Sequence, residues 1–382
     1  MDYSPLVPKL VNLAIEIQQI PAPTFAEQQR GDFIYNQFLN EELSEVSRDR
    51  MGNIYAKIPG VGLKSPIVVS AHIDTVFPES ENLAVTQNGN KVFGPGIGDN
   101  SLGIAGLFGL AWILKRRVLA DQDLQEYDTL GELSLPGDIW LVANIGEEGL
   151  GDLSGMRAVV DRFEDRMLAY IVLEGMALGQ VYHRALGVQR YRIKVETPGG
   201  HSWVDYGRPS AIHELARIIN LLTQISLPLS PRTSLNVGMI EGGTSINTIA
   251  PCAQCELDLR SESASTLAEL IFQVEDLVIN ANKHQVKATS EVIGRRPAGS
   301  ISVNHTLIQI VIDQLASLGI QPVLSIGSTD ANIPLSRGLP AVCLGLTTGN
   351  GAHTKDEYID IQPIRHGLAQ LIGVVKQVFQ EL

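Results

Sequence analysis

Short apolar runs alternate with segments of helical periodicity through the first half of the chain. Apolar side chains recur at helical spacing from Leu10 to Ile17, which predicts a helix that ends before Pro21. Ser101–Lys115 is almost wholly apolar and predicts a buried helix packed on a sheet. Apolar runs of strand length predict strands at Asn53–Ile58, Ile67–Ala71, Asp138–Ile145 and Leu168–Leu173. Strands that alternate with helices are typical of a parallel sheet covered on both faces.

Three shorter features interrupt this half of the chain. Thr24 and Glu27 have the spacing of a capping box, which predicts the start of a second helix. A glycine-rich loop, GPGIGDN, spans Gly94–Asn100 directly before the apolar helix. Asp121–Gly137 is polar and acidic, which predicts an excursion on the surface.

The pattern changes near Gly187, where apolar and polar residues begin to alternate as in a half-exposed antiparallel strand. The elements expected there have the order β-α-β-β-α-β, which is typical of a ferredoxin-like α+β unit. They are Val188–Glu196, a helix at Ala211–Leu222, Ser234–Ile240, Cys252–Arg260, a helix at Thr266–Ala281, and Val286–Val292. From Asn304 the alternation of helices and strands returns. We therefore expect a small domain of residues 187–294 inserted into a larger α/β domain of residues 1–186 and 295–382.

Composition narrows the classes of protein that fit. A chain of 382 residues with 44% hydrophobic and 19% charged residues predicts a globular protein of two domains. The net charge of -13 argues against nucleic acid or an anionic membrane as a partner, because both would repel the chain. We expect no signal peptide, and no run approaches the roughly 18 apolar residues of a membrane span. Three cysteines cannot form a disulfide framework, which favours a reducing cytoplasm.

Candidate chemistry begins at the end of the strand PIVVSAHIDT. His72 and Asp74 are spaced i and i+2, so an extended backbone places them on the same side. The carboxyl ends of strands are where open α/β sheets bind their ligands. On this stretch alone, a strand that turns into an ordinary polar loop explains the pair equally well.

Further ligand-type residues follow other strands or loops. They are Asp99 in the glycine-rich loop, Glu147 and Glu148 after IWLVANIG, Glu174 after AYIVL, and His353 shortly after AVCLGL. Each alone has an ordinary explanation, such as turn chemistry for an acid in a glycine-rich loop or a solvated helix start for adjacent glutamates. Their coincidence at one expected sheet edge favours a site for two divalent ions of zinc type, held by two histidines and three carboxylates.

These motifs resemble the dizinc metallopeptidase and amidohydrolase family of acetylornithine deacetylase, succinyl-diaminopimelate desuccinylase, glutamate carboxypeptidase and peptidase T. The resemblance rests on SAHIDTV, GDN, GEEG, LEG and GAHTKDE and spans nearly the whole chain. It implies a zinc-exopeptidase-like, mostly parallel mixed sheet flanked by helices. It also implies that the inserted domain is a lid and dimerisation domain, so we expect a homodimer.

The resemblance assigns a role to each residue of the expected metal site. His72 and Glu148 would bind one metal, His353 and Glu174 the other, and Asp99 would bridge the two. Asp74 would accept a proton from the His72 ring and orient it. Glu147 would be the general base that takes a proton from the metal-activated water and delivers it to the leaving amine. Zinc is the metal expected first, with cobalt or manganese as alternatives. The family also implies a cis peptide bond between Asp99 and Asn100.

In the inserted domain, His201 in TPGGHSW matches a histidine that reaches the partner subunit's active site and stabilises the oxyanion. Asn247 and Arg260 match positions that hold substrate polar groups or a carboxylate. Arg260 could instead be an exposed strand residue paired with Asp258.

The sequence therefore predicts a metal-dependent hydrolase of a peptide or N-acyl-amino-acid amide bond. One alternative is an aminopeptidase of the sister dizinc clan, which the ferredoxin-like insertion argues against. Another is a non-catalytic binding protein on the same fold, which would be expected to have lost Glu147 or a ligand. Asn100-Ser101-Leu102 and Trp203 depart from better-characterised branches and leave the substrate open. Glu174 in place of an aspartate favours deacylase or carboxypeptidase chemistry over that of peptidase T.

Overall fold

The computed structural model describes residues 2–115 and 135–382, which form two compact units. The first unit comprises Met1–Arg184 and Ser300–Leu382, and the second is Ala185–Gly299. The sequence pattern predicted the insertion at residues 187–294. Most of the predicted surface excursion at Asp121–Gly137 lies outside the described residues, although Leu135, near its end, is buried.

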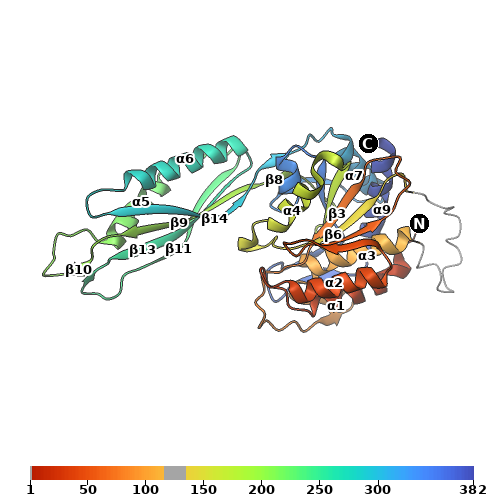
Figure 1. The fold of residues 1–382 in the computed structure, drawn as a ribbon, viewed down its shortest axis with the longest axis horizontal. Coiled ribbons are helices and arrows are strands. Elements are labelled where there is room, and N and C mark those ends of the chain that lie inside the picture. The colour runs from red at the N-terminus through yellow and green to blue at the C-terminus, as the bar shows by residue number, and fades with distance from the viewer. Residues whose placement is uncertain (1, 116–134) are drawn as a thin grey trace. The chain divides into compact units, whose positions relative to one another are not determined.

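A nine-stranded mixed sheet forms the centre of the first unit (Figure 1). Its order is β1 (Ser44–Arg48), β2 (Ile54–Ile58), β6 (Ile139–Asn144), β3 (Ile67–His72), β7 (Ala169–Glu174), β17 (Ala341–Gly345), β8 (Gln180–Ala185) and β15 (Gly299–Ser300), with β16 (Val323–Gly327) paired to β8. The neighbours β6, β3, β7 and β17 run parallel. Strands β1, β2 and β8 pair antiparallel beside them. The carboxyl ends of the four parallel strands therefore lie along one edge.

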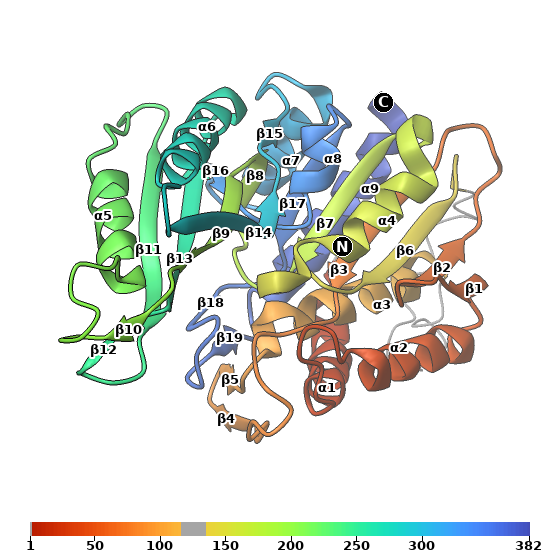
Figure 2. The ribbon, with the colours of Figure 1, turned by 60° about the vertical axis from the view of Figure 1, so that its left-hand side comes forward.

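Helices cover both faces of this sheet (Figure 2). One face carries α1 (Val7–Gln18), α2 (Gln28–Asn40), α3 (Leu102–Leu114), α7 (Thr306–Ser317) and α9 (Ile364–Glu381). The other face carries α4 (Ser154–Phe163) and α8 (Asn332–Ser336). Successive side chains of β2 point to opposite faces of the sheet, so they contact different helical layers. Ile54 approaches α2, and Tyr55 contacts Phe163 of α4.

Helix α3 is the apolar helix that the sequence predicts, and its residues from Leu102 to Trp112 are all buried. The window Ile97–Leu114 is long and apolar enough to cross a membrane, but 83% of it is buried inside the protein. A small sheet lies beside its start, formed by β18 (Gly349–Asn350), β19 (Tyr358–Asp360), β5 (Lys91–Phe93) and β4 (Thr86–Asn88).

The second unit has the predicted β-α-β-β-α-β order. Its four-stranded antiparallel sheet has the order β11 (Thr233–Gly242), β13 (Cys252–Ser261), β9 (Gly187–Glu196) and β14 (Lys287–Arg296). Helices α5 (Ala211–Thr223) and α6 (Ala264–Asn280) pack on one face and share its apolar core (Figure 1). A separate two-stranded ribbon is made by β10 (Gly200–His201) and β12 (Thr248–Ile249).

The predicted capping box is wrong. Helix α2 begins after Glu27, which has helical backbone angles and makes no side-chain capping bond. Thr24 and Glu27 instead bond to residues far along the chain, at Asp74 and Gly146. A local motif was thus overridden by tertiary contacts. Strands β1, β4, β5 and β8 and helix α4 are further elements that the sequence pattern did not predict.

Candidate metal centre

His72 is the last residue of β3, and its ring is 1% exposed. Its Nδ1 atom lies 3.0 Å from the backbone oxygen of Asp74 and 3.5 Å from Oδ1 of the same residue. Since Nδ1 meets acceptors, the ring hydrogen belongs there, and Nε2 is left to face the site. The carbonyl of Asp74 is thus the nearer partner of Nδ1, whereas the family resemblance implied the carboxylate.

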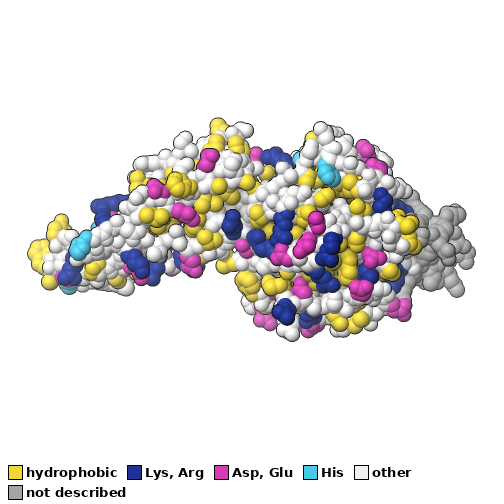
Figure 3. Space-filling model, turned by 45° about the horizontal axis from the view of Figure 1, so that its top comes forward, with side chains coloured by type: hydrophobic (Ala, Val, Ile, Leu, Met, Phe, Trp, Pro, Cys, Tyr) yellow, Lys and Arg dark blue, Asp and Glu magenta, His cyan; other side chains and the backbone are white. Residues whose placement is uncertain are grey.

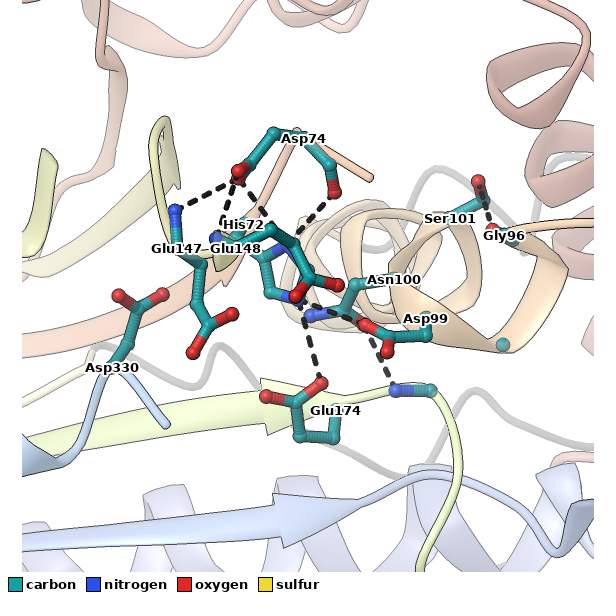
Figure 4. Close-up of polar contacts among 12 residues, drawn as sticks. His72, Asp74, Gly96, Asp99, Asn100, Ser101, Glu147, Glu148, Glu174 and Asp330 are labelled. Carbon is teal, nitrogen blue, oxygen red and sulfur yellow. Dashed lines mark hydrogen bonds and ion pairs between the residues drawn. The ribbon is translucent and has the colours of Figure 1, made fainter. Parts of the chain in front are cut away.

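The carboxylate of Asp74 has a second set of partners (Figure 4). It accepts the backbone N–H groups of Glu147 at 3.0 Å and Glu148 at 2.9 Å. It also accepts the hydroxyl of Thr24 at 2.9 Å. Glu27 adds to the same arrangement, because its carboxylate accepts the N–H of Gly146 at 3.2 Å. These bonds fix the backbone that carries the two adjacent glutamates.

Asp99 lies near the end of the glycine-rich loop, and the peptide bond between Asp99 and Asn100 is cis, as predicted. The Asn100 side chain donates to the carbonyl of Leu173 at 2.8 Å and accepts from the N–H of Gly175 at 2.9 Å. The Asn100 side chain is therefore bonded to the residues on both sides of Glu174, and it connects the end of β7 to the loop that carries Asp99.

Five predicted ligand residues come together at this edge of the sheet. Nε2 of His72 lies 3.1 Å from Asp99 Oδ1 and 3.7 Å from Glu174 Oε2. Nε2 of His353 lies 3.1 Å from both Asp99 Oδ2 and Glu148 Oε1. Two groups whose donor atoms converge are His72, Asp99, Glu174 and Asp99, Glu148, His353, and Asp99 belongs to both. The expected partition is therefore corrected, because Glu174 lies with His72 and Glu148 with His353.

The electrostatics of the cluster fit divalent cations. Burial alone would lower the pKa of His72, but hydrogen bonds to Asp74, Asp99 and Glu174 raise it well above its ordinary value. Burial raises the pKa of Glu174. Within the part of the chain that the structure describes, Asp99, Glu148 and Glu174 make ion pairs with histidines alone. Carboxylate and imidazole donors whose ion pairs involve no lysine or arginine have the donor chemistry of a zinc-type site, and of the two histidines His72 is buried while the His353 side chain is 54% exposed.

Glu147 lies beside these ligands, and 5% of it is exposed. One of its carboxylate oxygens belongs to a third convergent group with His72 and Glu148. Figure 4 shows its side chain directed toward the side where Glu174 lies. Its side chain thus lies beside the ligands while its backbone is held by Asp74.

Two buried acids were missed by sequence reasoning. Asp330 accepts a 2.6 Å hydrogen bond from the Asn144 side chain, and burial raises the pKa of Asp330 to about 7. Glu357 accepts three backbone N–H groups of the glycine-rich loop. Only Glu357 carries a sequence signal, since it ends the motif GAHTKDE that contains His353.

The remaining candidates lie in the second unit. His201 and Asn247 are neighbours, because β10 and β12 pair and the Ser202 N–H donates to the Asn247 carbonyl at 3.0 Å. Both side chains are on exposed residues. Arg260 lies on the four-stranded sheet and donates to Asp258 Oδ2 at 2.7 Å, which is the alternative that the sequence left open.

Two family models match the chain. The peptidase dimerisation domain matches residues 185–286, and peptidase family M28 matches residues 53–185. Succinyl-diaminopimelate desuccinylase of Corynebacterium glutamicum is 26% identical over 380 residues, covering 97% of this chain and 95% of that protein.

Solved structures share the fold over nearly the whole chain. Aminopeptidase PepT of Bacillus cereus has a TM-score of 0.77 at 20% identity, covering 97% of this chain and 98% of that one. A dinuclear metal-binding peptidase of the M20 family from Bacillus subtilis has a TM-score of 0.70 at 16% identity, covering 99% of each chain. The predicted mixed α/β fold with helices on both faces is confirmed. Over nearly its whole length the chain is thus similar to the metallopeptidases and amidohydrolases that include succinyl-diaminopimelate desuccinylase and acetylornithine deacetylase, and it is a hydrolytic enzyme.

Proposed function

We propose that the protein hydrolyses the amide bond of a small peptide or an N-acyl amino acid, with two divalent metal ions and Glu147 as general base. The observation that carries this proposal is the convergence of His72, Asp99, Glu148, Glu174 and His353 at the carboxyl ends of the parallel strands. The dinuclear metal-binding peptidase of similar fold supports a pair of ions.

His72 and Glu174 would hold one ion, Glu148 and His353 the other, and Asp99 would bridge them. Zinc suits two imidazoles and three carboxylates best, and cobalt or manganese would also be accepted by such donors. Ions held there would polarise the amide carbonyl and acidify a bound water.

Glu147 is the acid proposed to move protons. Its backbone position is fixed by Asp74, and its carboxylate belongs to neither of the two groups that share Asp99. It would accept the proton of the attacking water and deliver it to the leaving amine nitrogen. Asp74 would act through others, since it orients both the His72 ring and the backbone of the two glutamates.

His201 is proposed to stabilise the oxyanion. Its Nδ1 atom accepts the backbone N–H groups of Trp203 at 3.2 Å and Val204 at 3.4 Å. These bonds leave the hydrogen on Nε2, where it can be donated to a developing negative oxygen. The match to the peptidase dimerisation domain supports a homodimer in which this histidine serves the partner subunit's site.

Asn247 is proposed to hold a polar group of the substrate, as its place beside the His201 segment supports. Arg260 has weaker support as the residue that binds a substrate carboxylate, because it would first have to break its ion pair with Asp258.

A cytoplasmic location is proposed from the three cysteines, all of which are free. On the face drawn in Figure 3, basic and acidic side chains are interspersed, which gives no support for a nucleic-acid partner.

The test is a screen of the metal-free protein, reconstituted in turn with zinc, cobalt and manganese. Dipeptides, tripeptides and N-acyl amino acids are the substrates, and released amine is measured. We expect hydrolysis of at least one class that requires added metal. Hydrolysis that is equal in the metal-free protein would contradict the proposal.

A further inference from the structure

Glu357 is a carboxylate with no exposed surface. Its Oε1 atom accepts the N–H groups of Gly98 at 2.7 Å and Asp99 at 2.8 Å, and its Oε2 atom accepts that of Gly96 at 2.9 Å. Its own carbonyl accepts the N–H of Gly94 at 2.9 Å. Burying a charge without partners is costly, so this concentration of backbone donors explains how the carboxylate is tolerated.

The glycine-rich loop is shaped to wrap this carboxylate. Gly96 has a φ of 75°, in the region that favours glycine. A Cβ atom at Gly98 would lie 2.7 Å from the Met176 side chain, so the loop at this point has no room for one. Successive N–H groups can therefore turn inward toward one acceptor.

Glu357 also connects two segments that carry proposed ligands. Strands β5 and β19 pair antiparallel, with Phe93 opposite Tyr358. The Asp99 loop follows β5, and the His353 loop precedes β19. Glu357 stands at the junction, four residues after His353 and bonded directly to the backbone of Asp99. Its carboxylate thus ties together the two segments whose side chains meet at 3.1 Å, between Asp99 Oδ2 and His353 Nε2.

We propose that Glu357 is a positioning residue that holds Asp99 and His353 at the separation that the metal pair requires. This inference rests on the proposed function. Glu357 contacts neither substrate nor metal in this role, and acts through the backbone of the glycine-rich loop. These hydrogen bonds form in the metal-free protein, so the ligand side chains are already positioned when a metal ion binds.

Two variants separate hydrogen bonding from charge. Glu357→Asp keeps the charge but withdraws the carboxylate by one methylene group from the N–H donors. Glu357→Gln keeps the length but sets an NH2 group where one carboxylate oxygen accepted a backbone N–H. Asp356→Asn is the matched control, because it removes a charge from the exposed neighbouring residue without touching the loop.

The measurement is zinc affinity of each metal-free protein, by competition with a chromophoric chelator. We expect both Glu357 variants to bind zinc about 10- to 100-fold more weakly than the wild type, with Asp356→Asn unchanged. Wild-type affinity in both Glu357 variants, with tight binding in the wild type, would overturn this inference alone. A wild type that binds no zinc would overturn the proposed function and this inference with it.

If the Glu357 variants do not fold, the inference can still be tested by hydrogen exchange on the wild-type protein. In the metal-free protein, hydrogen exchange at the amides of Gly96, Gly98 and Asp99 should be strongly retarded, because each is bonded to a buried carboxylate. Exchange at the rate of an open loop would overturn the inference.

Discussion

The hydroxyl of Thr24 donates a 2.9 Å hydrogen bond to the carboxylate of Asp74, which also holds the backbone of Glu147 and Glu148. Thr24→Val removes this donor and should lower the free energy of unfolding by about 1 kcal/mol. Amide hydrolysis should slow as well, because Asp74 loses one of the bonds that orient it. Chemical denaturation and kcat measure the two effects.

Thr24→Ser is the control, since it restores the hydroxyl and should restore both stability and kcat. If Thr24 instead capped α2, Thr24→Val would reduce helix content by circular dichroism. That loss, with kcat unchanged, would contradict the role given to the Thr24–Asp74 bond.

This bond also marks how far the sequence could predict the structure. Thr24 and Glu27 have a spacing that is a local signal for a helix cap, but their partners are Asp74 and Gly146. No pattern along the chain reports a contact between residues so far apart. The same limit explains the corrected ligand partition. Strand ends predict that Glu148 and Glu174 reach the site, whereas strand order and the Asn100 side chain decide which histidine each one meets.

What the sequence did predict depends on short-range periodicity. The run from Leu102 to Trp112 is apolar on every side, so only a fully buried helix could accommodate it. The alternation of apolar and polar residues from Val188 to Glu196 likewise predicted that β9 has one buried and one partly exposed face. The sequence did not predict the role of Glu357, because a charged residue near a loop is usually solvated. Its burial depends on glycine N–H groups elsewhere in the chain.

Metal removal should act on one of the two units. All five proposed ligands lie in the first unit, so zinc at 100 times its Kd should stabilise that unit by about 2.7 kcal/mol and leave Ala185–Gly299 unaffected. Differential scanning calorimetry with zinc and with chelator measures both units. Equal shifts in both transitions, or none in either, would count against a metal site confined to the first unit.

Zinc binding should depend on pH through His353. Hydrogen bonds to Asp99 and Glu148 raise the pKa of His353 to about 10 in the metal-free protein. Because this folded-state pKa is raised, the proton stabilises the metal-free fold fully below the unfolded pKa, and that contribution is lost as pH rises through about 10. Metal must displace the proton, so zinc affinity should increase between about pH 7 and 10.

Calorimetric titration at pH 8, in two buffers of different ionisation enthalpy, counts the protons released. His353→Ala should release fewer protons than the wild type. Identical release from both proteins would show that His353 is not deprotonated by metal binding.

The assignment of His201 to the partner subunit can be tested by mixing inactive variants. A dimer of one His201→Ala and one Glu147→Ala protomer would contain one site with both Glu147 and the partner's intact histidine. Random mixing should therefore restore about one quarter of wild-type activity. If His201 serves its own subunit, the mixture should stay as inactive as the two parents.

The central claim is that Glu147 moves the proton while other residues hold the metals. Glu147→Gln preserves the size of the side chain and removes its basicity, and Glu148→Gln is the matched change at the adjacent proposed ligand. Metal content and kcat should be measured on both. We predict that Glu147→Gln retains two zinc ions and loses about 100-fold or more of kcat, while Glu148→Gln also loses metal. Near-normal turnover by zinc-loaded Glu147→Gln would contradict the account.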